Sequence, residues 1–217
     1  MELNFVFKTG WAGQASDFEP LKQSLKALLP DARFFDWHTD VGNPVIQAQT
    51  WIGIGHSLGF ADLVSANHSW QGLVSLQGFT HFRSAAVDSC AGTPSRLLRL
   101  MQKRFSQTPE KVVVEFLETA GFAQDRCKCN ALTASGQQAL SDGLQRLYDL
   151  NVALPQDVKV LAIASQDDAI VPANLTQYCF SGKPDVELYW LANGSRHALH
   201  QHQAQACAAL LVKWLGR

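Results

Sequence analysis

The sequence lacks a strong net charge, a long apolar run and a basic N-terminal segment. It has 18 Lys and Arg against 19 Asp and Glu in 217 residues, a net charge of -1. No overall field therefore favours nucleic acid or an anionic membrane as a partner. No apolar run approaches the roughly 20 residues that span a bilayer. The start, MELNFVF, has neither the basic head nor the long apolar core of a signal peptide, so we expect a cytoplasmic protein.

The sequence also lacks a disulfide framework. Its five cysteines are odd in number and irregular in spacing. They are Cys90, Cys127, Cys129, Cys179 and Cys207. Only Cys127 and Cys129 are close in sequence, and no second Cys or His pair follows at ligand spacing. We expect reduced thiols in a reducing compartment and no metal site at these residues.

Apolar, strand-like runs alternate with helix-like segments along the chain. The expected strands are residues 3–7, 32–36, 51–55, 72–77, 158–164 and 186–191. The expected helices outside the middle of the chain are 17–29, with Asp17 or Ser16 as N-cap, 60–67 and 199–215. Apolar strands that alternate with helices predict an α/β fold, with a parallel sheet covered on both faces.

About 70 residues between the fourth and fifth expected strands contain no convincing strand, and such a stretch is too long for a loop. Helical patterns cover residues 95–105 and 137–150, and Thr108 and Pro109 form an N-cap and first position for a helix between them. We expect residues 84–152 to form a helical cap, inserted into a core built from residues 1–83 and 153–217.

A nucleophile motif follows the third expected strand. Residues 51–60 read as a short buried strand, then Gly-x-Ser-x-Gly with Ser57 at its centre, then a small-residue helix start. Gly55 and Gly59 would let the strand and helix backbones approach closely. Ser57 would then lie beside a helix N-terminus, whose N–H groups favour a developing oxyanion. The alternative is a chance glycine turn, which the flanking strand and helix disfavour.

A serine nucleophile needs a base, and the base needs an orienting carboxylate. Asp167 and Asp168 follow the fifth expected strand, and the residues alone leave the two equivalent. His197 follows the sixth strand, with His200 and His202 as alternatives for the base. The three histidines could also be a metal cluster, but no carboxylate accompanies them at ligand spacing.

These motifs resemble the α/β-hydrolase superfamily over nearly the whole chain. The run from Asp168 to Val171 and Pro172 matches the acid loop of that family and selects Asp168 over Asp167. His197, at the end of Gly-Ser-Arg-His, matches the family histidine. The resemblance implies an α/β-hydrolase fold: a mostly parallel sheet of about six strands with a helical cap after the fourth.

The same resemblance implies a Ser57–His197–Asp168 triad that needs no metal or cofactor. It also places a second oxyanion donor in the loop after the first strand, residues 9–13 (TGWAG). The donors would be the backbone N–H groups of Trp11 and Leu58.

A closer resemblance is to the pimeloyl-ACP methyl ester esterases of biotin synthesis. It rests on Gly10-Trp11, on His-Ser-Leu-Gly at residues 56–59, on residues 77–82 (QGFTHF) and on a cap of basic, leucine-rich helices. It implies a serine carboxylesterase that acts on pimeloyl-ACP methyl ester. A general short-chain esterase and an acyl thioesterase with the same triad are alternatives. A non-catalytic hydrolase-like binding protein is an alternative of another class, because fold does not fix function.

A basic stripe in the expected cap favours an acidic partner. Residues 94–105 contain four basic residues and no acidic one, namely Arg96, Arg99, Lys103 and Arg104. The first three share one helix face. A positive stripe near the pocket would suit acyl carrier protein, which is acidic. The alternative is an ordinary solvated helix face.

Overall fold

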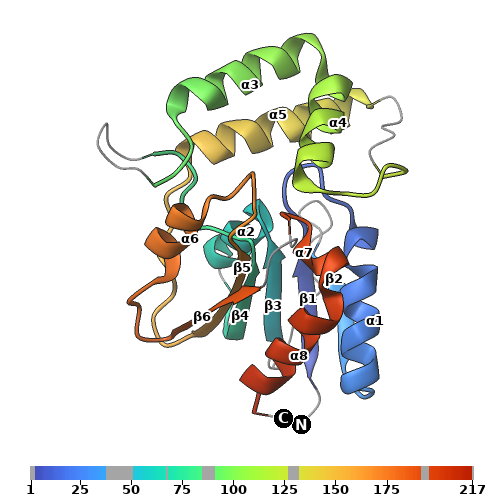
Figure 1. Ribbon diagram of the computed structural model, residues 1–217, viewed down its shortest axis with the longest axis vertical. Helices are drawn as coiled ribbons and strands as arrows, with labels where there is room; N and C mark the ends of the chain where they lie inside the picture. The colour runs from blue at the N-terminus through green and yellow to red at the C-terminus, as the bar shows by residue number, and fades with distance from the viewer. Residues whose placement is uncertain are drawn as a thin grey trace.

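A single six-stranded sheet forms the centre of the molecule (Figure 1). The computed structural model describes residues 3–37, 51–66, 68–84, 91–126, 132–191 and 196–216. The strands are β1 (Asn4–Lys8), β2 (Arg33–Asp36), β3 (Trp51–His56), β4 (Trp70–Leu76), β5 (Lys159–Ser165) and β6 (Val186–Leu191). They lie in the order β2-β1-β3-β4-β5-β6, and every neighbouring pair is parallel. The predicted parallel sheet is confirmed.

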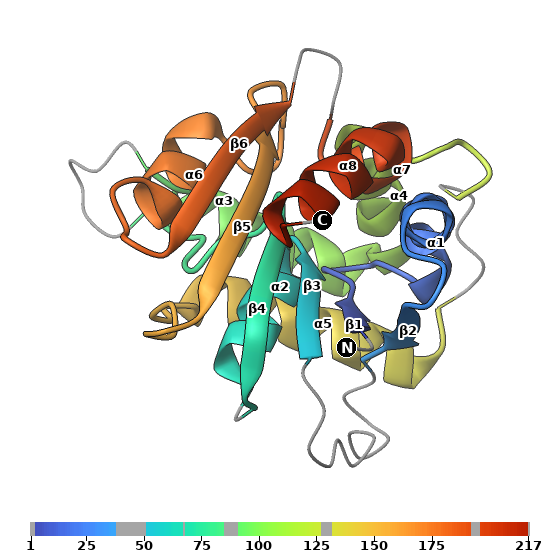
Figure 2. The same ribbon diagram turned by 90° about the horizontal axis from the view of Figure 1, so that it is seen from below.

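Helices cover both faces of the sheet, as Figure 2 shows. One face carries α1 (Glu19–Leu28), α7 (Leu199–His202) and α8 (Ala204–Trp214); the other carries α2 (Leu58–Ser65) and α6 (Ala173–Phe180). Alternate residues of one strand enter the two cores: Phe5 and Phe7 pack in one, and Val6 in the other. This burial on both sides explains why the strands read as continuous apolar runs.

Three helices between β4 and β5 form a layer over the carboxyl ends of the strands (Figure 1). They are α3 (Ser95–Gln107), α4 (Pro109–Ala120) and α5 (Ala134–Asp149). We refer to this layer as the cap. Residues 85–90 and 127–131 of the expected cap lie outside the described residues. From β1 the chain goes outward to β2 and then returns to β3 on the other side of β1, so the strand order reverses between β1 and β3. Ligands of open α/β sheets bind at the carboxyl ends of the strands at such a switch point, which here lies beneath the cap.

The predicted start of the first helix is wrong. Asp17 and Ser16 lie inside a 3-10 turn, η1 (Ala15–Phe18), and do not cap α1. The Asp17 carboxylate instead accepts the Gln14 N–H at 2.7 Å. The α-helix begins at Glu19, because Pro20 favours the first turn of a helix, where its missing N–H costs nothing.

The predicted terminal helix, residues 199–215, is two helices. Gln203 takes φ -125°, which interrupts the helical backbone between α7 and α8. None of the helices in the described ranges has the length and apolar character needed to cross a bilayer. Cys179 and Cys207 are buried free thiols, and Cys90, Cys127 and Cys129 fall outside the described residues.

Candidate active site

Ser57 stands on a sharp turn between β3 and α2. Its backbone has φ 55° and ψ -129°, a strained conformation for a residue other than glycine. A Cβ on Gly55 would lie 2.3 Å from Phe60 Cα, and one on Gly59 would lie 2.3 Å from the Lys8 oxygen. Neither position has room for a side chain. The prediction that these two glycines allow strand and helix to approach is confirmed.

The loop after β1 runs directly against this serine. A Cβ on Gly10 would lie 2.7 Å from Ser57 Cβ and 3.2 Å from its Oγ. Trp11 is the next residue of the loop, and Leu58 is the first residue of α2. Backbone N–H groups in a helix's first turn have no partner within the helix and point outward from its N-terminus. Leu58 therefore follows Ser57 directly in sequence, and Trp11 follows Gly10, the residue that lies against Ser57.

Asp168 and His197 form a buried pair. His197 Nδ1 lies 2.7 Å from Asp168 Oδ2, and both side chains are fully buried. The other carboxylate oxygen, Oδ1, accepts the N–H groups of Ile170 at 2.7 Å and Val171 at 2.9 Å. These bonds fix the carboxylate, so that it receives Nδ1–H and leaves Nε2 as the acceptor nitrogen. Asp168 makes this contact, whereas its neighbour Asp167 lies exposed.

The imidazole of His197 has one ring nitrogen unused. Within the described part of the chain, its buried Nε2 has no hydrogen-bond partner. Buried polar atoms without a hydrogen-bond partner are rare in proteins, and a role in catalysis is one reason for them. The His197 carbonyl accepts a hydrogen bond from His56 Nε2 at 3.0 Å, which ties the histidine segment to the serine turn.

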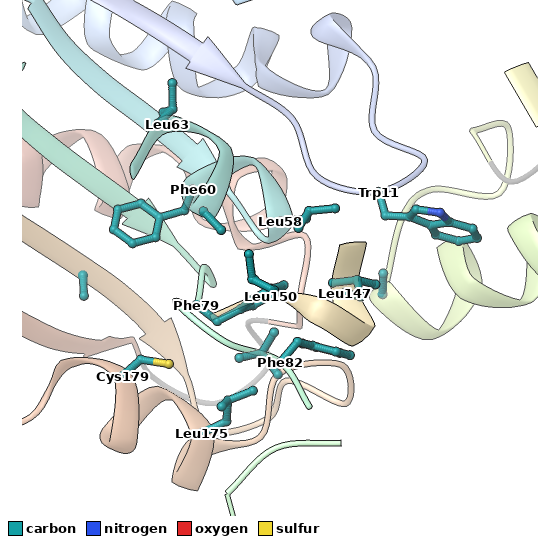
Figure 3. Close-up of a cluster of buried hydrophobic side chains, with 14 of the residues drawn as sticks. Trp11, Leu58, Phe60, Leu63, Phe79, Phe82, Leu147, Leu150, Leu175 and Cys179 are labelled. Atoms are coloured by element: carbon teal, nitrogen blue, oxygen red, sulfur yellow. The ribbon is translucent and has the colours of Figure 1, made fainter. Parts of the chain in front are cut away.

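A cavity of about 190 Å³ opens onto Ser57 beneath the cap. Ser57 and Thr93 supply hydroxyl groups, and its other lining residues are apolar. They are Trp11, Phe79, Phe82, Leu97, Leu98, Met101, Phe116, Leu147, Ala169 and Ile170. Figure 3 shows several of them gathered between Leu58 and the cap. No charged side chain lines the cavity among the described residues, so it suits a short apolar chain.

Comparison with known proteins rests on structure, since no family model and no curated protein matches the chain. The esterase EaEST from Exiguobacterium antarcticum superposes with a TM-score of 0.75 at 12% identity, covering 99% of this chain and 92% of that one. A bromoperoxidase from Bacillus anthracis gives 0.69 at 15%, covering 98% and 91%. BioG from Haemophilus influenzae gives 0.63 at 11%, covering 93% and 91%.

The chain has the α/β-hydrolase fold. In this α/β-hydrolase fold, sequence reasoning missed the apolar lining of the cavity. The lining residues come from the loop after β1, the serine turn, the segments that follow β4 and β5, and all three cap helices, so no local pattern unites them. The apolar spacing of the cap helices, which includes Leu98, Phe116 and Leu147, was the available signal.

The three histidines of the expected segment have different surroundings in this α/β-hydrolase fold. His197 pairs with Asp168, His202 Nε2 lies 2.6 Å from the Gly121 oxygen, and the His200 ring lies 4.3 Å from that of His56. Burial lowers the pKa of His56 well below its usual value and lowers the pKa of His200 to about 3. Both are therefore neutral at pH 7. In the described ranges, no three Cys, His or acidic residues could together hold a metal ion.

The basic stripe lies on α3, in the cap of the α/β-hydrolase fold. Arg96, Arg99 and Lys103 are exposed, as are Leu97 and Leu100 on the same helix. Arg99 donates a hydrogen bond to the Tyr148 hydroxyl at 2.7 Å, an interaction that lowers the pKa of Tyr148. The fourth predicted member, Arg104, forms an ion pair with Glu115 of α4. Its charge is therefore already balanced within the cap.

Proposed function

We propose that this protein is a serine carboxylesterase with Ser57 as nucleophile, His197 as general base and Asp168 as its orienting acid. One observation carries the proposal. The Asp168–His197 pair is fully buried and leaves Nε2 unpartnered, within the described residues, beside the strained serine turn. A buried acid, an oriented imidazole and a serine on a strand-to-helix turn are the parts that acyl transfer needs.

The mechanism follows from these positions. Ser57 Oγ attacks the ester carbonyl while His197 Nε2 takes its proton, and Asp168 stabilises the imidazolium. The N–H groups of Trp11 and Leu58 hold the oxyanion of the tetrahedral intermediate. His197 then gives the proton to the leaving alcohol, and an acyl-enzyme remains. Water, deprotonated by His197, attacks the acyl-enzyme and releases the acid.

The finer proposal is that the substrate is pimeloyl-ACP methyl ester. The cavity supports it, because an apolar space of about 190 Å³ suits a methylene chain and an uncharged methyl ester. The exposed cations of α3 support it, because an acidic carrier protein could dock there. The small cavity equally fits a general short-chain esterase. Turnover of the carrier-bound methyl ester against p-nitrophenyl butyrate and a butyryl thioester distinguishes these functions.

Substitution of the nucleophile tests the general proposal. Ser57→Ala should lower kcat on p-nitrophenyl butyrate by about 10⁴-fold or more, because the acyl-enzyme can no longer form. It should also abolish covalent labelling by a fluorophosphonate probe. Ser65→Ala is the matched control, because Ser65 is an exposed serine at the end of α2, the helix that follows Ser57. This variant should keep both the turnover and the labelling. Retained turnover and labelling in the Ser57 variant would refute the triad, and absence of both from the wild type would favour a binding protein.

A further inference from the structure

The loop after β1 is held by the cap as well as by the core. The Trp11 indole N–H donates to the Leu140 oxygen of α5 at 2.8 Å. Its ring lies 5.9 Å from that of Phe105 in α3 and 4.8 Å from that of Phe116 in α4. A single side chain of this loop thus contacts all three cap helices. In Figure 3 the indole is directed away from Leu58 and Phe60.

A second contact joins the same loop to the segment after α4. Arg126 Nη2 donates to the Ala12 oxygen at 2.6 Å, and its Nε donates to Asp17 Oδ1 at 2.9 Å. The Asp17 carboxylate also accepts the Gln14 N–H at 2.7 Å. Arg126 therefore bridges the two ends of the segment that follows Gly10. Its side chain is 18% exposed and that of Asp17 is 4% exposed, so the ion pair is largely shielded from water.

The backbone between these anchors is strained. Ala12 has φ 58°, in the left-handed region that a residue with a Cβ rarely adopts. Such a conformation persists only where the surrounding structure holds it. Arg126 binds the carbonyl of Ala12 itself, one residue after Trp11. The contact therefore acts on the part of the loop that lies against Ser57.

We propose that Arg126 is a positioning residue for the oxyanion hole. Together with Trp11 it makes the cap hold the loop, so that the Trp11 N–H points at the oxyanion that forms on the substrate. This inference rests on the proposed esterase function. An oxyanion donor acts mainly in the transition state, so loss of its position lowers kcat and leaves substrate binding largely unchanged.

The test compares two cap arginines. Arg126→Gln removes the contact to the loop. Arg146→Gln is the matched control, because Arg146 of α5 forms an ion pair with Asp62 of α2 at 2.8 Å, away from the Ala12 carbonyl. Both variants lose one ion pair between cap and core. Only the first should affect the oxyanion hole if the proposal is correct.

Two readouts use the active site. With p-nitrophenyl butyrate, Arg126→Gln should lower kcat about 10- to 100-fold with KM changed less than about threefold, since loss of a whole oxyanion donor costs about 10²–10³. Butylboronic acid, which forms a tetrahedral adduct with a nucleophilic serine, should bind more weakly by a similar factor. Arg146→Gln should leave kcat, KM and boronate affinity within about twofold. Adding Ala12→Gly to Arg126→Gln should restore part of kcat, because glycine adopts positive φ without strain.

A third readout does not depend on activity. With fluorotryptophan incorporated, the resonance assigned by Trp11→Phe should shift in Arg126→Gln and stay in place in Arg146→Gln. Equal losses of kcat in the two arginine variants, or an unshifted Trp11 resonance, would overturn the proposal. If the wild type neither hydrolyses esters nor takes the fluorophosphonate label, the esterase function fails. The fluorine spectrum then still decides whether Arg126 holds the loop.

Discussion

The serine turn and the cap contacts are built in opposite ways. Ser57 is placed by its own neighbours in sequence, Gly55 and Gly59, whose lack of side chains lets backbones touch. The cap meets the loop after β1 through side chains from distant parts of the chain. Trp11 and Leu140 are 129 residues apart, and Asp17 and Arg126 are 109 apart. The serine turn therefore depends mainly on glycines close to it in sequence, whereas the cap contacts of the loop after β1 are long-range.

This difference has an energetic side. A Cβ at Gly55 or Gly59 would lie 2.3 Å from a backbone atom, so an added side chain would force the backbone to shift, at a cost of about 1–3 kcal/mol or more. Side-chain contacts at the cap instead lose their contributions one at a time. Substitutions near the proposed triad should therefore show large, specific effects, and those on the cap should show graded ones.

After Ser57→Ala, the largest expected effect separates the two neighbouring acids. Asp168→Asn should lower kcat by about 10³- to 10⁴-fold, because an amide favours the wrong imidazole tautomer. Asp167→Asn, at the exposed adjacent position, is the matched control and should keep kcat within about twofold. Steady-state kinetics on p-nitrophenyl butyrate measures both. A comparable loss of kcat in the two variants would show that Asp167 and Asp168 share the role of the acid.

An effect of intermediate size concerns the pH dependence of stability, through the buried His200. Burial lowers the pKa of His200 to about 3, so the folded state resists a proton that the unfolded state takes up below about pH 6.5. Stability should therefore fall on acidification from about pH 6.5, by about 2 kcal/mol at pH 5 from this residue alone. Urea unfolding at several pH values measures this.

The comparison protein for this experiment is His200→Gln. The free energy of unfolding of this variant should depend less steeply on pH between 6.5 and 5 than that of the wild type. The remaining slope should include a part from His56, whose pKa burial also lowers. Identical pH dependences of the free energy of unfolding in the two proteins would show that burial does not lower the pKa of His200 in the folded state. They would contradict the prediction.

The smallest expected effect tests the cap surface. Reversal of Arg96, Arg99 and Lys103 to Glu should lower kcat/KM for an acyl-ACP methyl ester by about tenfold, because charge steers encounter. Activity on p-nitrophenyl butyrate should change little. The wild-type preference for the carrier-bound ester should shrink with salt, since exposed charges are screened within about 10 Å at 0.1 M.

The control reverses an equal number of exposed cations outside the cap: Lys26, Lys159 and Lys183. It changes net charge by the same amount, so it isolates the position of the charges from their number. Similar losses in both triple variants would indicate a general charge effect. No loss in either would remove α3 as the docking surface and favour the general esterase.

The sequence predicted what local patterns encode. All six strands could be located because both faces of the sheet are apolar, and the serine turn because its glycines are adjacent to it. The choice of Asp168 over Asp167 came only from a family resemblance, since the two residues differ in burial and not in chemistry. Arg126 could not be found, because its partners Ala12 and Asp17 lie more than 100 residues away in sequence.

The cap enters the chain as one continuous insertion between β4 and β5, and the proposed nucleophile, acid and base all lie outside it. In evolutionary terms, recombination of that single segment would exchange the cap side of the cavity and the exposed cations of α3 in one event, while Ser57, Asp168 and His197 stay in place. The contacts of Arg126 and Leu140 limit this freedom. A transplanted segment must bring its own support for the loop after β1, so compatible donors are those that share this pair of anchors.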